Sequence, residues 1–183
     1  MSIKKLIALL FMTFILVFNG IGNFGFCEEN NLVERSRQAK ELYSSEEMAL
    51  LKQKSEFITG NYQNVFPLGV ECILNESMNF KFDTPPVIKE GRTMVPVRTV
   101  AEAFEASVHW DPLERKVTVR KDKKEILIWV GGKRVSVNGK TNEIDVPALI
   151  LNGRAMVPLR FITENLGLTI LYHANYGIVE IID

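Results

Sequence analysis

The stretch that decides the fold is Gly-Arg-Thr-Met-Val-Pro-Val-Arg at residues 91–98, because the chain repeats it as Gly-Arg-Ala-Met-Val-Pro-Leu-Arg at residues 153–160. We call the spacing from Gly91 to Gly153 the repeat offset. Beyond the motif, residues that are separated by the same offset are again alike, and apolar residues correspond to apolar ones, such as Val100 to Ile162. Glycine, proline and arginine at a fixed spacing are typical of a duplicated structural unit. A catalytic site instead brings different groups to one point, so this pattern predicts architecture more than chemistry.

Each copy is predicted to form a hairpin, a short helix and a second hairpin. Gly91 and Gly153 are expected in tight turns that need a positive φ, which glycine adopts without strain. Pro96 and Pro158 cannot donate to a strand ladder, so they should end the return strand and open the helix. These four residues are therefore predicted to be structural.

The predicted fold class is α+β, with antiparallel strands, short helices and a two-fold internal repeat of hairpin-helix-hairpin units. Two further strands are expected between the copies, since apolar and polar residues alternate over residues 126–130 and 135–137. The domain is predicted to cover residues 67–183, with its repeat halves at about 85–121 and 147–183. A helical segment or spacer at residues 28–66 is expected to precede it.

Residues 1–27 are predicted to be a signal peptide, because Lys4 and Lys5 precede an almost wholly apolar run from Leu6 to Phe18. The run is short for a hydrocarbon core of about 30 Å, so no transmembrane helix is expected after cleavage; a retained anchor is the alternative. The protein should be secreted or associated with the cell surface. Cys27 lies at or near the cut, and Cys72 is then the only cysteine left and is expected to be a buried thiol.

Two segments in front of the repeat have local signals of their own. The spacing of Ser44 and Glu47 predicts a capping box that opens a helix through Met48, Leu51 and Phe57 and ends near Gly60. Alternating apolar residues then predict a strand at residues 70–74, a turn at 75–77 and a strand at 78–82.

Charge and motif content exclude several classes of function. Lysine plus arginine equals aspartate plus glutamate at 22 each, so no net field favours nucleic acid as a partner. No phosphate-binding glycine loop or nucleophile elbow occurs in the sequence. His109 and His173 are the only histidines and have no metal-ligand spacing, so no metal and no cofactor are expected.

Arg98, Arg160, Trp110 and Tyr172 are the candidate ligand-binding residues. Arg98 and Arg160 stand four residues before Glu102 and Glu164, so a helix-surface ion pair or a guanidinium that fixes a strand end is the structural alternative to an arginine cluster. Trp110 and Tyr172, like Trp129, could stack on sugar rings, or could belong to the core as strand aromatics often do.

The pattern Asp83-Thr84-Pro85-Pro86 through Arg98, then Val108-His109-Trp110-Asp111, then Val117 and Val119, resembles the copper amine oxidase N-terminal-like domain family. The second copy from Asp145 to Arg160 resembles the second half of that domain, and the likeness covers about residues 78–183. The resemblance implies an exported, stalk-like module of Gram-positive bacteria that performs no oxidation. Copper chemistry does not carry over, because Asn61-Tyr62 and Asn175-Tyr176 lack the following acidic residue and the histidine set of the oxidase.

The sequence therefore predicts a non-catalytic exported structural or binding module, not an enzyme. Its expected partner is cell-wall polymer or another exported protein. Two alternatives stay open: an accessory polysaccharide-acting hydrolase that uses a pair of carboxylates, and a copper-handling protein.

Overall fold

A computed structural model describes residues 31–183 of the chain. The predicted signal peptide, with Cys27, lies outside the described residues. Residues 31–41 are helical, and a compact unit extends from Ala39 to Asp183 and contains all the elements that follow. None of the helices in residues 31–183 combines the length and the apolar character that a membrane span needs.

The helix α2 (Ser45–Asn61) begins at the predicted capping box. The Ser44 hydroxyl accepts the Glu47 N–H, and the Glu47 carboxylate accepts the Ser44 N–H, so two otherwise unpaired donors of the first turn are satisfied. Leu51 and Ile58, seven residues apart, face inward. Phe57, an apolar residue of the predicted helix, is 52% exposed.

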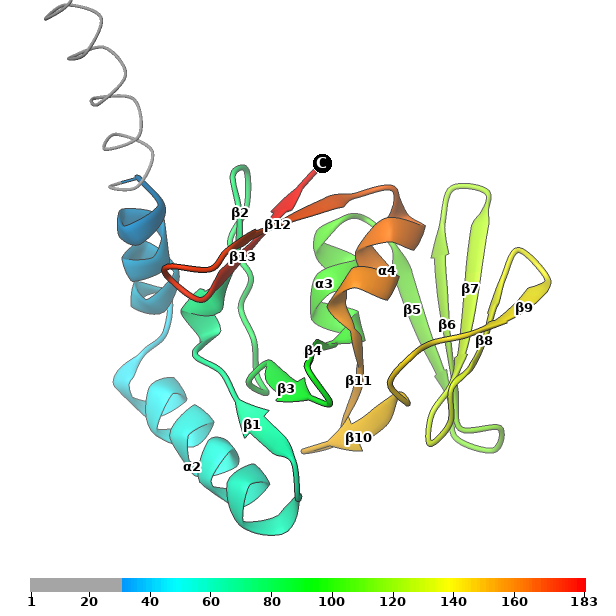
Figure 1. Ribbon diagram of the computed structural model, residues 1–183, viewed down its shortest axis with the longest axis horizontal. Helices are drawn as coiled ribbons and strands as arrows, with labels where there is room; N and C mark the ends of the chain where they lie inside the picture. Colours follow the sequence, from blue (N-terminus) through cyan, green and yellow to red (C-terminus); the bar gives the residue numbers. More distant parts are fainter. Residues whose placement is uncertain (1–30) are drawn as a thin grey trace, which may run out of the picture. The chain divides into compact units, whose positions relative to one another are not determined.

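The first sheet has the strand order β1-β3-β4-β11-β10, and all its pairs are antiparallel (Figure 1). Both of its two-residue turns have positive φ at both positions, 49° and 72° at Glu90-Gly91 and 48° and 74° at Asn152-Gly153. These are the angles of the turn type that suits the twist of a hairpin. The strands are β1 (Val65–Pro67), β3 (Val87–Lys89), β4 (Arg92–Pro96), β10 (Leu149–Leu151) and β11 (Arg154–Pro158).

At the centre of this sheet β4 of the first copy pairs with β11 of the second. Val95 lies opposite Val157, Met94 opposite Pro158, and Pro96 opposite Met156. Suppose that each residue is replaced by its equivalent in the other copy, at the repeat offset. The Met94–Pro158 pair then becomes the Met156–Pro96 pair, and the Val95–Val157 pair is unchanged. This register is the one that a local two-fold axis through the Val95–Val157 pair produces, since directly opposed residues of antiparallel strands are related in that way.

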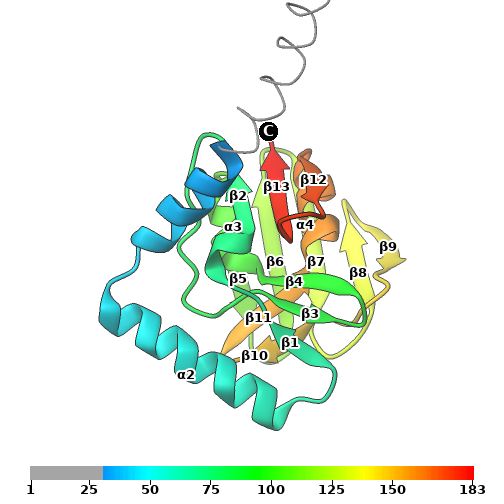
Figure 2. The same cartoon turned by 60° about the vertical axis from the view of Figure 1, so that its left-hand side comes forward.

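Each central strand leads directly into a helix, α3 (Val97–Ala103) or α4 (Leu159–Leu166). Pro96 and Pro158 stand just before the helices with φ of −58° and −57°, the angle to which the proline ring is restricted. The two helices lie next to each other in both views (Figures 1 and 2). Their inward faces are buried: Val97, Val100 and Ala101 in α3, and Leu159, Ile162, Thr163 and Leu166 in α4.

After the helices the two copies continue into different sheets. The hairpin that follows α3 is extended to the order β5-β6-β7-β8-β9, with strands β5 (Ser107–Asp111), β6 (Lys116–Lys121), β7 (Lys124–Trp129), β8 (Arg134–Val137) and β9 (Lys140–Glu143). The hairpin that follows α4 forms the order β12-β13-β2, with β12 (Thr169–His173), β13 (Ile178–Ile182) and β2 (Ile73–Asn75). The β13–β2 pair is parallel, which departs from the wholly antiparallel prediction. The α+β class is confirmed.

The segment before the repeat differs from the prediction at two points. Val70–Cys72 forms a 3₁₀ turn, and only Ile73–Asn75 is a strand. Residues 78–82 form no strand, although Phe80 and Phe82 are buried as their alternation suggested. The apolar pattern was interpreted correctly, but no strand within residues 31–183 pairs with this segment.

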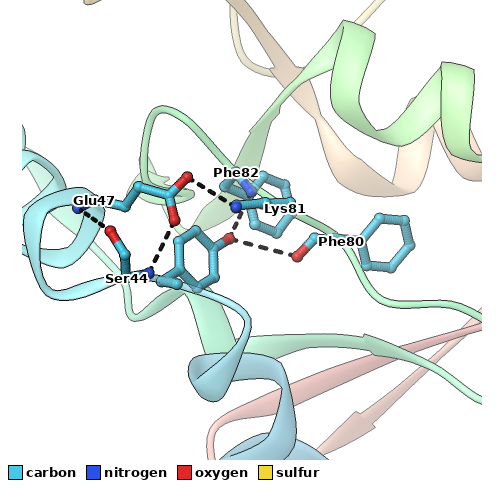
Figure 3. A network of polar contacts seen from close by, with 6 residues as sticks. Ser44, Glu47, Phe80, Lys81 and Phe82 are labelled. Atoms are coloured by element: carbon cyan, nitrogen blue, oxygen red, sulfur yellow. Dashed lines mark hydrogen bonds and ion pairs between the residues drawn. The ribbon is translucent and has the colours of Figure 1, made fainter.

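Tyr43 supplies the hydrogen bonds that a partner strand would have given, and they go to the backbone of Phe80 and Phe82, two of the residues labelled in Figure 3. Its hydroxyl accepts the Phe82 N–H at 2.6 Å and donates to the Phe80 carbonyl at 3.4 Å. Lys81, between them, forms an ion pair with Glu47 of the capping box at 2.8 Å. Burial raises the pKa of Tyr43 to about 12. The start of α2 thus holds the segment that leads into Asp83.

Replacing Gly91 or Gly153 by alanine should lower the free energy of unfolding by about 1–3 kcal/mol, the usual cost of a left-handed conformation for a residue with a Cβ. Gly60→Ala is the matched control, because an added Cβ meets nothing within 4 Å at any of the three positions but only Gly91 and Gly153 have a positive φ. Denaturant unfolding measures the difference. Equal stability of the hairpin variants and the control would contradict the turn assignment.

Tyr43→Phe should cost about 1–3 kcal/mol of stability, because it leaves the buried Phe82 N–H without its acceptor. Tyr172→Phe serves as the control, since Tyr172 is 67% exposed and its loss of a hydroxyl leaves no buried donor. Thermal melting of both variants compares them. A Tyr43 variant as stable as the control would show that the hydroxyl does not hold the segment.

Candidate functional site

A groove of about 340 Å³ opens between the first copy's helix start and the second copy's first hairpin. The first copy contributes six of its lining residues: Pro96, Val97, Arg98, Val108, Trp110 and Val117. The second copy contributes four more, all from the β10–β11 hairpin: Ile150, Gly153, Arg154 and Ala155. Neither copy alone would form this groove.

A second groove of about 340 Å³ has the same construction with the copies exchanged. The second copy now contributes six residues: Pro158, Leu159, Arg160, Ile170, Tyr172 and Val179. The first copy contributes Ile88, Gly91, Arg92 and Thr93. The repeat offset relates each of these ten positions to a position that lines the first groove. We call these the first and second grooves.

The four candidate ligand-binding residues that the sequence singled out all line a groove. Arg98 and Trp110 lie in the first groove, and Arg160 and Tyr172 lie in the second. The four candidates therefore form two separate pairs and do not meet at one point. Pro96, Gly153, Pro158 and Gly91, predicted as structural, also line the grooves because the turns and helix starts form the groove walls.

Two lining residues, Arg92 and Arg154, were missed by the sequence reasoning. Both stand directly after the turn glycine, so the repeated Gly-Arg pair was the signal that could have found them. The sequence did not reveal that each reaches the groove of the other copy, because this depends on the β4–β11 pairing.

These two arginines form reciprocal ion pairs between the copies. Arg154 Nε donates to Asp83 Oδ2 at 2.7 Å, and Arg92 Nε donates to Asp145 Oδ2. Asp83 and Asp145 are themselves related by the repeat offset, so the exchange of copies converts one pair into the other. The hydrogen bond from Arg154 lowers the pKa of Asp83 below its ordinary 3.8, and that from Arg92 does the same for Asp145.

The arginines of the two helix starts differ in their contacts. Arg98 lies 3.4 Å from Glu102, as the spacing of four residues predicted, and its Nη2 donates to the Val108 carbonyl at 3.5 Å. Both contacts support the structural interpretation of Arg98. The equivalent Arg160–Glu164 ion pair is not formed within residues 31–183.

The aromatic residues of the two grooves, Trp110 and Tyr172, differ in solvent exposure. Tyr172 is 67% exposed, whereas Trp110 is half-buried and packs against the main core. Trp129, the third aromatic that the sequence considered, lines neither groove, and the guanidinium carbon of Arg134 lies 4.0 Å from its ring centre. The structure thus separates Trp129 from the candidate site.

Histidine and cysteine lie away from the grooves. His109 is exposed on β5, and His173 Nε2 lies 3.0 Å from Glu180 Oε2. Cys72 is buried as expected, and burial raises the pKa of its thiol to about 12. In the part of the chain that the structure describes, His, Cys, Asp and Glu nowhere gather in a group of three that could hold a metal ion.

Comparison with known proteins identifies the family. Residues 72–181, more than half of the chain, match the family described as the copper amine oxidase N-terminal domain. The protein belongs to this family, as the repeated motif suggested. A stretch of 81 residues is 33% identical to a primary amine oxidase of Klebsiella aerogenes. The match covers 43% of this chain but only 11% of that enzyme, so it concerns one small part of the oxidase.

Removing both reciprocal carboxylates, by Asp83→Asn with Asp145→Asn, should lower stability at neutral pH by less than about 1 kcal/mol per pair, because all four side chains are about half exposed. Folding lowers the pKa of both carboxyl groups. Their contribution to the free energy of unfolding is therefore complete above the unfolded-state pKa of 3.8 and is lost as the pH falls through their folded-state pKa values. The wild type and the double variant should therefore converge in acid.

Denaturant unfolding at neutral pH and in strong acid measures this convergence, and Asp122→Asn, in the β6–β7 turn, is the control. A difference between wild type and double variant that persists unchanged in strong acid would show that the charges of these carboxylates do not join the copies.

Proposed function

We propose that the protein is a non-catalytic exported binding module of a Gram-positive bacterium, which attaches to cell-wall polymer through its two grooves. The observation that carries the proposal is the equivalence of the grooves at all ten lining positions. Two similar sites on one small module suit a repetitive ligand, because a second contact with the same polymer strengthens the first. Another exported protein is the alternative partner.

The character of the groove linings supports binding in preference to hydrolysis. A glycosidase needs a carboxylic acid with a raised pKa and a second carboxylate within about 5–10 Å. Among the described residues, neither lining includes an aspartate or a glutamate. Asp83 and Glu102 do line an adjoining hollow of about 380 Å³, but each contacts an arginine, and the pKa of Asp83 is lowered.

The family membership supports the same proposal at a coarser level. The domain in this family's description is the N-terminal part of copper amine oxidases, and the sequence resemblance implied a part that performs no oxidation. A module of this kind contributes attachment or spacing to a larger assembly. Its catalytic partner, where there is one, would lie elsewhere.

The test is retention on purified Gram-positive cell walls. The purified protein is mixed with insoluble wall material and sedimented, and the proposal predicts that it is retained and then released by soluble wall fragments. An unrelated protein of zero net charge is the control. Recovery of all the protein in the supernatant, at low salt and at physiological salt, would contradict wall binding. Cell fractionation tests export in parallel, and a cytoplasmic location would contradict that part.

A further inference from the structure

The chemistry of the groove linings identifies the ligand class more closely than the proposed function does. We infer that each groove binds a sugar ring that bears a carboxylate or a phosphate, so that one chain holds two such units of an anionic glycan. This assignment rests on the proposed function. The charges, the aromatic rings and the equivalence of the two grooves each support it.

Within residues 31–183, the only charged side chains that line either groove are arginines. Arg98 and Arg154 line the first groove, and Arg92 and Arg160 line the second. The carboxylates that contact three of them lie outside both linings; they are Asp83, Asp145 and Glu102. From the described part of the chain, each groove therefore offers two guanidinium groups and no carboxylate, and a ligand with anionic oxygens complements them.

The ion pairs leave part of each guanidinium available to a ligand. Arg92 contacts Asp145 through Nε, and Arg154 contacts a single oxygen of Asp83 through Nε and Nη2. A guanidinium carries five N–H donors in a planar fork, so donors remain on both arginines. That fork matches the two oxygens of a carboxylate or phosphate, which is why arginine recognises these groups.

Beside the arginines each groove has an aromatic ring and an apolar wall. Trp110 and Tyr172 occupy the equivalent positions, and Val117 and Val179 lie behind them on the next strand. An aromatic ring that is exposed, as Tyr172 is, or partly exposed, as Trp110 is, offers a flat apolar surface beside the aliphatic side chains, on which the C–H face of a sugar ring can stack. An anion with no ring would leave this surface uncovered.

The second groove retains the chemistry of the first. Six of the ten equivalent positions have the same residue in both grooves, including both arginine positions. At three of the four positions that differ, the two residues are similar, such as Trp110 and Tyr172. At the fourth, Ala155 of the first groove corresponds to Thr93 of the second. The two grooves should therefore take the same class of ligand, and the larger ring of Trp110 should make the first groove the tighter site.

Titration calorimetry with defined oligosaccharides tests the inference. The probes are a galacturonate trimer, a hexose-phosphate trimer, and a neutral chitin trimer of the same ring count. We expect two equivalents of one or both anionic probes to bind per chain, and the neutral probe to bind at least tenfold more weakly. The tighter of the two anionic probes distinguishes a carboxylate from a phosphate ligand.

Single aromatic variants assign the binding sites. Trp110→Ala and Tyr172→Ala should each reduce the stoichiometry to one, and the double variant should abolish binding. Trp129→Ala, outside the grooves, should retain both sites. Arg160→Gln should weaken the second site for anionic probes without changing the melting temperature, because no ion pair within residues 31–183 is lost. Circular dichroism establishes that each variant is folded.

Equal binding of neutral and anionic probes, no binding of any probe, or full binding by the folded double variant would overturn the inference. Failure of this inference can be distinguished from failure of the proposed wall binding. If the double variant is still retained by cell walls, wall binding stands and the grooves are not its site. If the anionic probes bind at two sites but walls do not retain the protein, the grooves are binding sites for anionic sugars and the wall is not the partner.

Discussion

The antiparallel pairing of β4 with β11 is the contact on which both grooves depend. Val95 and Val157 face each other at its centre and are fully buried. Because the register is symmetric about this pair, the first hairpin of each copy is brought beside the helix start of the other. Every groove therefore has walls from both copies, and the reciprocal contacts of Arg92 with Asp145 and Arg154 with Asp83 join the copies on either side of the central pair.

Burial on both faces explains why this central pair is almost wholly apolar. Val95 and Val157 pack in the main core together with residues of α3 and α4. Met94 and Met156, whose side chains point to the opposite face, pack in a second cluster with Ile58 of α2. A strand covered on both faces reads as a continuous apolar run instead of an alternating one. The helix α2 is thus part of the packing of the sheet.

The sequence predicted those parts of the fold that local chemistry determines. The turns at Gly91 and Gly153 need a positive φ, the helices start at the two prolines, and the capping box depends on residues three positions apart. Strands β1 and β9 were missed, because Lys140–Glu143 has no apolar residue and Val65–Pro67 is only three residues long. Both strands exist because a neighbouring strand offers backbone groups, which no local pattern can report. For the same reason the strand predicted at residues 78–82 was wrong: Phe80 and Phe82 are buried, but their backbone bonds go to the Tyr43 side chain.

The sequence was sufficient to find several residues of the candidate site, but not to predict how they are arranged in space. The repeat drew attention to Arg98, Arg160, Trp110 and Tyr172, and these residues do line concave surface. Their division into two grooves, and the arrival of Arg92 and Arg154 from the opposite copy, follow from long-range pairing. A crystal structure of the protein measures this pairing most directly, through superposition of residues 85–121 on residues 147–183. We predict a rotation close to a half-turn about the Val95–Val157 pair, with the hairpins and helices of the two copies aligned and Arg92 superimposed on Arg154. Halves that do not superimpose, or a β4 that pairs with a strand other than β11, would contradict the structural basis of both grooves.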